Sequence, residues 1–208
     1  GFAKDVEAWT KSTGNTLLDL KMAGGKVSAQ IQKGLGNVVQ PAGGTVLPTP
    51  TSGKDLTMVV FSGDLDKAIA TFIIANGFAA MGQKATLFFT FWGLNILRKP
   101  EPVNVKKTFI EKMFGWMMPR GADKLTLSQM HMMGAGTAMI KGIMKKYNVD
   151  SLPEMIRTAQ KNGVRILACQ MSMDLMGIKM EELIDGVESA GVATMAVSAT
   201  DSNTHYFI

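Results

Sequence analysis

Leu56-Thr57-Met58-Val59-Val60-Phe61-Ser62-Gly63-Asp64 is a continuous β-rich run followed by a polar turn. The run over 56–61 is typical of a strand buried on both faces, and Ser62-Gly63-Asp64 predicts a turn that ends in a helix N-cap. A helix is expected from residue 65 to about 81, closed by Gly82, and a second strand over 85–91. Because strand, helix and parallel strand in that order require a right-handed crossover, the sequence predicts an α/β fold with a parallel sheet flanked by helices.

Further elements follow downstream from apolar periodicity and turn residues. Pro153 suits the first turn of a helix over Ser151–Asn162, which stops at Gly163. The other expected elements are a proline-bounded turn at 98–102, helices at about 105–116 and 137–147, a strand at 164–168 leading into Cys169, short helices near 171–176 and 180–183, a helix at 192–199 and a last strand at 205–208.

The beginning of the chain predicts a short, incomplete α+β segment over residues 1–40. We expect a helix at about 4–14 and two strands near 16–21 and 26–32, turned by Gly24-Gly25. Residues 41–54 hold three prolines and three glycines without periodicity and are interpreted as a linker. The remainder, 55–208, has the size of one domain. About forty residues bury too little surface to be stable alone.

Composition excludes several classes of protein. Hydrophobic residues make up 46% of the chain and mean hydropathy is +0.12, so a large core is expected and disorder is excluded for most of the chain. The net charge is +5, but the lysines are scattered, which does not favour nucleic-acid binding. The apolar stretches 68–81 and 85–97 fall short of the ~18 residues that a membrane span needs.

The cysteine count sets the expected chemistry and compartment. One cysteine in 208 residues cannot form an internal disulfide, a CxxC redox pair or a Cys-based zinc cluster. No cofactor and no metal site are predicted. Since no secretory leader opens the sequence, we expect a protein of the reducing cytoplasm.

Cys169 is that cysteine, and it stands where an apolar strand gives way to a helix beginning at Gln170. Backbone N–H groups and the helix dipole at such a junction favour a thiolate over a thiol, and ligands bind at the carboxyl ends of strands in open α/β sheets. A free cysteine is also among the most buried residue types. The residues alone therefore leave two readings open, a reactive thiol and a small core hydrophobe.

Three segments resemble one known family. Ala168-Cys169-Gln170-Met171-Ser172-Met173-Asp174-Leu175-Met176-Gly177-Ile178 is similar to the active-site segment of the DsrE/DsrF-like sulfurtransferases. Residues 114–125 resemble the Met-rich insertion of one branch of that family, and 61–68 resemble its first strand–helix turn. The resemblance spans 55–208 and implies a flavodoxin-like sheet, a homo-oligomer and a cysteine that carries sulfane sulfur as a persulfide.

The N-terminal segment resembles the second half of a TusA-like sulfur-carrier domain, through residues 1–9 and 12–15. It lacks that family's first strand and its Cys-Pro motif, and Thr10 stands where many relatives carry a second cysteine. Because a carrier without its thiol cannot hold sulfur, we assign this segment no sulfur chemistry.

A sulfurtransferase or sulfur-carrier mechanism is the main hypothesis. The Cys169 thiolate would attack a donor's outer sulfur, hold it as a persulfide and release it to an acceptor thiol. Without a second cysteine, the acceptor must be another molecule. The expected partners are sulfur-donor and sulfur-acceptor proteins, TusA-like or rhodanese-like, or small thiols.

Several polar residues are candidates for lining this site. Ser62, Gly63 and Asp64 chiefly form a helix cap, but a place beside the Cys169 strand would also let them face the sulfur. Gln170, Ser172 and Asp174 lie on the helix that follows the thiol, and Asp174 could equally be a cap or pair with a lysine. His131 could act as a base or respond to pH, or be incidental in its stretch. These candidates are Ser62, Gly63, Asp64, His131, Gln170, Ser172 and Asp174.

The Met-rich segment 113–144 carries the alternative hypothesis, a non-catalytic binding or assembly module. It holds eight of the 17 methionines. Methionines fill gaps in cores, so a lid over the core is one reading, and a surface that docks a partner or a neighbouring subunit is the other. Peripheral membrane contact is a third and weaker reading, since three lysines flank the apolar face. A thiol peroxidase ranks last because no Thr-x-x-Cys pattern precedes the thiol.

Overall fold

The protein is described by a computed structural model that covers residues 6, 10, 15–23, 26–32, 55–130 and 132–208. Contacts divide the chain into two units, Gly1–Thr49 and Pro50–Ile208. The expected linker at 41–54 and nearly all of the expected first helix lie outside the described residues.

In the first unit, β1 (Thr16–Ala23) and β2 (Lys26–Gln32) pair as an antiparallel hairpin. The register shifts between Leu17 and Asp19, where one extra residue is accommodated. Both expected strands are confirmed, and the first extends two residues beyond its expected end.

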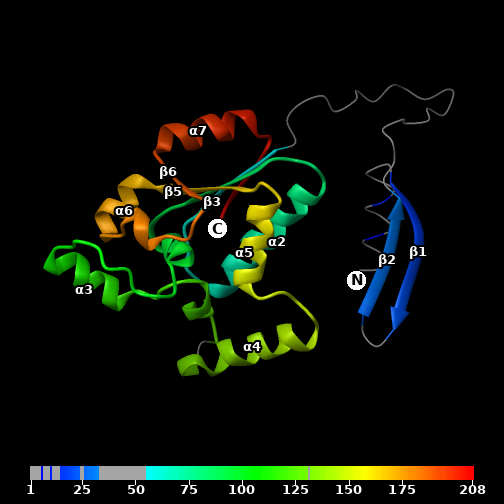
Figure 1. Cartoon of the computed structure of the whole chain (residues 1–208), viewed down its shortest axis with the longest axis horizontal. Coiled ribbons are helices and arrows are strands. Elements are labelled where there is room, and N and C mark those ends of the chain that lie inside the picture. Colours follow the sequence, from blue (N-terminus) through cyan, green and yellow to red (C-terminus); the bar gives the residue numbers. More distant parts are fainter. Residues whose placement is uncertain (1–5, 7–9, 11–14, 24–25, 33–54, 131) are drawn as a thin grey trace. The chain divides into compact units, whose positions relative to one another are not determined.

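The second unit contains a five-stranded, fully parallel sheet with strand order β6-β5-β4-β3-β7 (Figure 1). This is the α/β, flavodoxin-like architecture that the sequence predicts, a parallel sheet flanked by helices. The strands are β3 (Leu56–Val60), β4 (Ala85–Phe89), β5 (Arg165–Cys169), β6 (Val187–Ala190) and β7 (Thr204–Phe207).

Two helices cover one face of the sheet. α2 (Leu65–Ala80) connects β3 to β4, and α5 (Leu152–Lys161) packs beside α2 and precedes β5. The alternation of side chains along each strand sends Leu87 and Phe89 to this face, where Phe72 of α2 stacks on Phe89 with ring centroids 6.0 Å apart. The main hydrophobic core therefore lies between the sheet and these two helices.

A single helix crosses the opposite face (Figure 1). α7 (Val192–Asp201) joins the two edge strands β6 and β7, and none of its residues is fully buried. Thr57 of β3 ties it to the sheet, since Thr57 Oγ1 donates to the Ser198 carbonyl at 3.0 Å and lies 2.7 Å from Ser202 Oγ. The small apolar cluster beneath α7 is separate from the main core.

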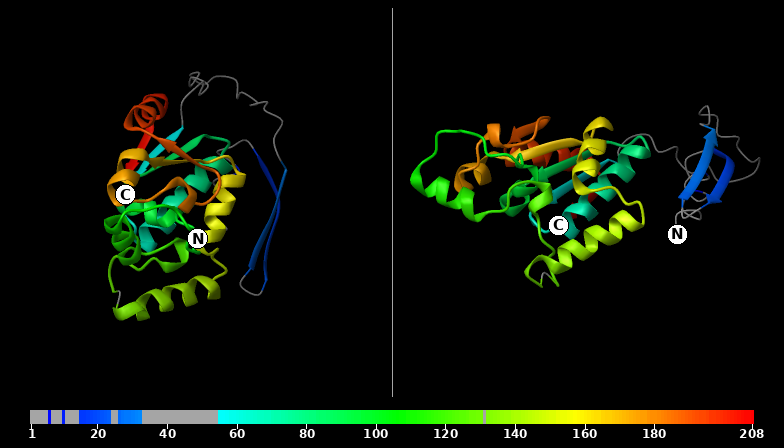
Figure 2. Two further views of the ribbon diagram at one scale, coloured as in Figure 1. Left: turned by 60° about the vertical axis from the view of Figure 1, so that its left-hand side comes forward. Right: turned by 60° about the horizontal axis from the view of Figure 1, so that its bottom comes forward.

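The remaining helices are short or lie away from the sheet (Figure 2). α6 (Gln170–Met176) follows β5 directly and contacts α3 (Phe109–Met117). α4 (Ala135–Lys146) carries basic residues in its last turn. Short 3-10 helices occupy Phe91–Leu97, Ala122–Lys124, Met132–Gly134 and Met180–Glu182.

Several expected boundaries are corrected. The second strand ends at Phe89 rather than residue 91, because the chain turns at Phe91 (φ 45°) into a 3-10 helix. The third helix begins at Phe109 rather than residue 105, at a capping box formed by Thr108 and Glu111. β6 was not expected at all. No helix in the described ranges is long and apolar enough to span a membrane.

The expected turn at 98–102 is wrong for its first residue. Arg98 is buried and bridges Leu183 through its backbone in an isolated antiparallel pair. The sequence placed Arg98 in a turn and gave no sign of its burial, which a carboxylate far along the chain, that of Glu182, allows.

Candidate functional site

Cys169 is the last residue of β5 and occupies the N-cap position of α6. β5 lies between β4 and β6, and Cys169 is in register with Ala190. The expected strand-to-helix junction is confirmed, and it places the thiol at the carboxyl edge of a parallel sheet.

The Cys169 side chain faces α7. Alternation along β5 puts Leu167 and Cys169 on one face of the sheet and Ile166 and Ala168 on the other. Cys169 is only 6% exposed and belongs to the small cluster that also contains Phe88, Leu167 and Ala190, with Val59 and Met195 packed against it. In the single chain, the apolar groups of this cluster come from the four neighbouring strands β3 to β6 and from α7.

The polar residues that follow Cys169 form two separate contacts. Gln170 Nε2 donates to Asp174 Oδ1 at 3.0 Å, and Ser189 Oγ donates to Gln170 Oε1 at 2.5 Å. Both contacts are exposed; the first lies within α6, and the second links β6 to the start of α6. Asp174 thus pairs with Gln170 rather than with a lysine.

Ser172 is fully buried, and its hydroxyl lies 2.7 Å from Thr90 Oγ1. Thr90 directly follows β4, the strand next to Cys169. Sequence reasoning missed Thr90, although a hydroxyl placed directly after a buried strand was an available signal.

The turn Ser62-Gly63-Asp64 does not adjoin the Cys169 strand, which corrects that expectation. β4 lies between β3 and β5, because parallel pairing joins β3 to β4 and β4 to β5. Asp64 occupies the N-cap position of α2, but its side chain does not cap the helix; Asp64 Oδ2 accepts from Ser62 Oγ and Lys67 Nζ, each at 2.8 Å. A Cβ on Gly63 would lie 2.7 Å from the Trp92 carbonyl oxygen, so this turn requires glycine.

His131 lies outside the described residues. Its candidate role as a base or pH sensor therefore stays a prediction. Within the described part of the chain, no group of three or more His, Cys, Asp or Glu side chains is arranged to hold a metal ion.

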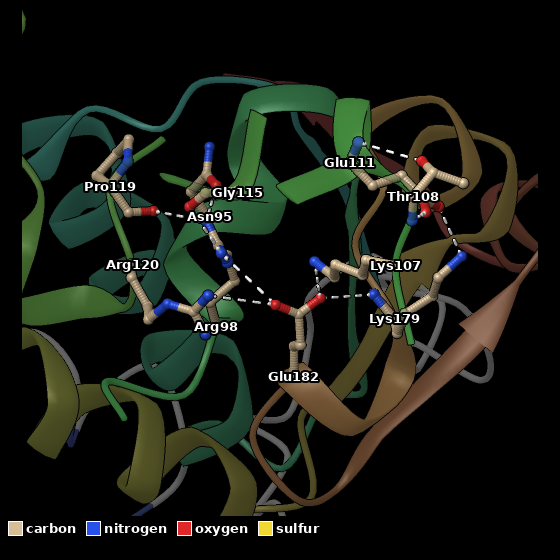
Figure 3. A network of polar contacts seen from close by, with 10 residues as sticks. All are labelled: Asn95, Arg98, Lys107, Thr108, Glu111, Gly115, Pro119, Arg120, Lys179 and Glu182. Atoms are coloured by element: carbon tan, nitrogen blue, oxygen red, sulfur yellow. Dashed lines mark hydrogen bonds and ion pairs between the residues drawn. The ribbon is translucent and has the colours of Figure 1, made fainter. Parts of the chain in front are cut away.

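Sequence reasoning also missed a buried ionic cluster around Glu182. The Glu182 side chain is 1% exposed, and Figure 3 shows basic groups approaching it from both sides. Arg98 Nη2 and Arg120 Nη2 lie 3.6 and 3.3 Å from Oε1. Lys107 Nζ lies 2.5 Å from Oε2, which also accepts the Lys179 backbone N–H at 3.0 Å.

This environment shifts the pKa values of both Glu182 and Arg98. Burial by itself raises the pKa of Glu182, but the hydrogen bonds from Lys107 and the Lys179 N–H, together with the Lys107 and Arg98 charges, outweigh it and hold that pKa below its ordinary value. Burial and the like charge of Arg120 lower the pKa of Arg98. Arginine nevertheless keeps its charge at neutral pH.

Comparison with known proteins now decides the family. The model of the DsrE/DsrF/DrsH-like family matches residues 52–207. The chain belongs to the DsrE/DsrF/DrsH-like family. The match includes the Cys169 junction and the Met-rich segment 113–144, and it begins after the first unit.

Relatives in this family are similar over the same part of the chain. The protein "Uncharacterized protein YrkE" of Bacillus subtilis (strain 168) is 54% identical over 155 residues, which is 74% of this chain and 97% of the relative. The "Sulfur carrier protein DsrE2" of Allochromatium vinosum is 38% identical over 159 residues, 74% of this chain and 98% of the relative. The solved structure of the E. coli ychN protein covers 74% of this chain and 99% of its own at 12% identity, with a TM-score of 0.44.

Proposed function

We propose that this DsrE/DsrF/DrsH-like protein is a sulfur-relay protein or sulfurtransferase whose Cys169 carries sulfane sulfur. The placement of Cys169 carries the proposal: the lone cysteine ends a parallel strand and precedes α6, at the sheet edge where α/β proteins bind ligands. The relative from Allochromatium vinosum, named as a sulfur carrier, supports it.

The chemistry proceeds through two balanced exchanges. The Cys169 thiolate attacks the outer sulfur of a donor persulfide, forming Cys169–S–SH and releasing the donor thiolate. An acceptor thiolate then attacks that outer sulfur, and Cys169 leaves as a thiolate. No external oxidant or reductant is consumed. The second thiol comes from a partner, a TusA-like or rhodanese-like protein or a small thiol, because the chain has one cysteine.

Access to Cys169 requires the α7 side to open. The thiol is 6% exposed within an apolar cluster against which Met195 of α7 packs, so a donor sulfur cannot reach it in this arrangement. α7 has no fully buried residue, and a loosely anchored helix opens at less cost than the main core. We infer that local displacement of α7, or contact with a partner, admits the sulfur.

Mass spectrometry of the intact chain tests the relay. After incubation with a persulfide donor and desalting, the wild type gains one sulfur atom, which is lost on adding an acceptor thiol. Cys169→Ser gains none, and Met171→Leu, changed beside the thiol on an exposed position, behaves like the wild type. Folded wild-type protein that gains no sulfur, or Cys169→Ser that gains it, refutes the proposal.

We further propose that residues 1–40 are a partial TusA-like segment, joined by a linker at 41–54 to a domain at 55–208. The β1–β2 hairpin and the start of the family match at residue 52 support this division. Limited proteolysis of the full chain should cut first within 41–54. First cleavage inside 55–208 contradicts it.

A second candidate function is assembly through the Met-rich segment. α3 has no buried residue, and Trp116 and Phe109 are 87% and 82% exposed. Exposed aromatic groups of this kind are enriched at protein contacts, so we infer a homo-oligomer that buries α3. In sedimentation velocity, Trp116→Gln combined with Met117→Gln should yield a smaller species. Phe207→Gln, an exposed aromatic of β7, is the control, and equal sizes for all three proteins refute the inference.

A further inference from the structure

A cavity of about 450 Å³ lies beside the buried ionic cluster. Its walls come from the segment that precedes α3, from α3 itself and from the residues around Arg120. The lining residues that matter for its chemistry are Lys107, Lys112, Gly115, Trp116, Arg120 and Glu182.

The charged groups in this wall are mostly basic. The lining holds three basic residues, Lys107, Lys112 and Arg120, and one acid, Glu182, whose two oxygens are both already in contact with donors. Oε1 contacts the two guanidinium groups, and Oε2 contacts Lys107 and the Lys179 N–H. Three basic groups share this one carboxylate, so two positive charges remain uncompensated. The three groups are those of Arg98, Arg120 and Lys107.

Two buried donors of the cluster also lack acceptors. Among the described residues, Arg120 Nη1 and Arg98 Nε have no hydrogen-bond partner. Buried N–H groups, charged ones above all, are costly without acceptors. The Arg98 and Arg120 guanidinium groups also repel each other across the carboxylate that they share. Of these basic groups, Arg120 and Lys107 line the cavity itself, so an unsatisfied donor and surplus positive charge at its wall both favour an anion.

We propose that this cavity binds a small tetrahedral oxyanion that carries two negative charges, of the sulfate, thiosulfate or hydrogen-phosphate class. Two negative charges match the surplus of the cluster. Guanidinium and ammonium groups donate several hydrogen bonds to such oxygens. Lys112, which makes no salt bridge in the described ranges, completes the site from α3.

The anion site is independent of the sulfur relay. Its lining residues are distinct from the cluster around Cys169, which consists of Phe88, Leu167, Ala190 and their neighbours under α7. We therefore expect Cys169→Ser to bind sulfate as tightly as the wild type does. The relay can fail without affecting the anion site.

Isothermal titration calorimetry of the full chain tests the site, with sodium sulfate as the probe and sodium chloride holding ionic strength constant. Sulfate should bind saturably, and the indole N–H resonance of Trp116, assigned with Trp116→Phe, should shift with the same midpoint. Lys112→Gln should weaken binding about threefold, as for one partly exposed charge. Arg120→Gln should weaken it about tenfold or more, as for charged hydrogen bonds.

The matched control is Lys106→Gln, which removes the same charge from an exposed neighbour that does not line the cavity. It should bind sulfate like the wild type. Circular dichroism and sedimentation velocity establish that each variant keeps its fold and assembly state. Absence of saturable binding, equal weakening by Lys106→Gln and Lys112→Gln, or unchanged binding in both Lys112→Gln and Arg120→Gln overturns the proposal.

Discussion

On one face of the sheet, α2 and α5 bury a large continuous core; on the other, α7 alone covers four buried side chains, one of them Cys169. Both faces belong to the same five strands, so strand sequence does not explain the difference. The connectivity of the chain explains this difference, since a single helix joins edge strand β6 to edge strand β7. The heavily covered face holds the main core, while the thinly covered face holds the thiol that must become accessible in the proposed relay.

The largest expected effect tests the stabilising face. Phe72 is fully buried on α2, and Phe72→Ala should lower the free energy of unfolding by about 3–5 kcal/mol because it leaves a cavity in the core. Val197→Ala on α7, where the side chain is exposed, should change it by about 0.5 kcal/mol or less. Urea denaturation measures both, and similar losses would erase the contrast between the faces.

Glu182→Gln should also be severely destabilising, by about 3–5 kcal/mol, because buried Arg98 loses the carboxylate that compensates its charge. Glu188→Gln is the matched control, since it breaks the exposed pair with Arg165, 2.7 Å apart, and should cost about 1 kcal/mol or less. Urea denaturation at neutral pH compares them. If the two variants are equally stable, buried Arg98 does not depend on Glu182 to compensate its charge.

Met195→Ala tests whether α7 controls access to the Cys169 thiol. Met195 packs against the cluster that contains Cys169, so shortening its side chain should speed alkylation of Cys169 by iodoacetamide about fivefold, the effect of making a local opening easier by about 1 kcal/mol. Met171→Ala, an exposed methionine of α6, should leave the rate unchanged. If the wild type, Met195→Ala and Met171→Ala are alkylated at the same rate and only denaturant raises it, α7 does not control access to Cys169.

The smallest effect concerns α3, which stands apart from both faces. The hydrogen bond from Lys179, with those from Thr108, lowers the pKa of Glu111 from 4.5 to about 2. Because the folded-state pKa lies below the unfolded one, this stabilisation is fully present above pH 4.5 and is lost as pH falls toward 2. Over that range, thermal unfolding temperatures should fall less for Glu111→Gln than for the wild type. Equal falls in the unfolding temperatures of the wild type and Glu111→Gln would show that the contact between Glu111 and Lys179 adds no stability.

Much of the fold was predictable because its signals are local. The β-rich run at 56–61, the helix stop at Gly82 and Pro153 in the first turn of α5 depend on residues near one another in sequence. The junction at Cys169 was found in the same way. β6 was missed because two of its four residues, Glu188 and Ser189, are exposed and polar, and only pairing with β5 makes the segment a strand.

The surroundings of the thiol were less accessible to sequence reasoning. The expected neighbour, the turn at 62–64, is one strand too far away, and Thr90 and Met195 were not anticipated. Strand order depends on which strands pair, and several orders fit the same alternation of strands and helices. Arg98 and Glu182 meet across more than eighty residues of chain, so neither residue's local context indicated burial.

Local patterning thus established the strands, the helices and the position of Cys169 at the end of a strand, because backbone geometry and apolar periodicity act over a few residues. Packing of distant segments determined which face the thiol takes, that α7 covers it, and that three basic side chains surround Glu182. These outcomes depend on strand order and long-range contacts, whose energies no short window of sequence contains.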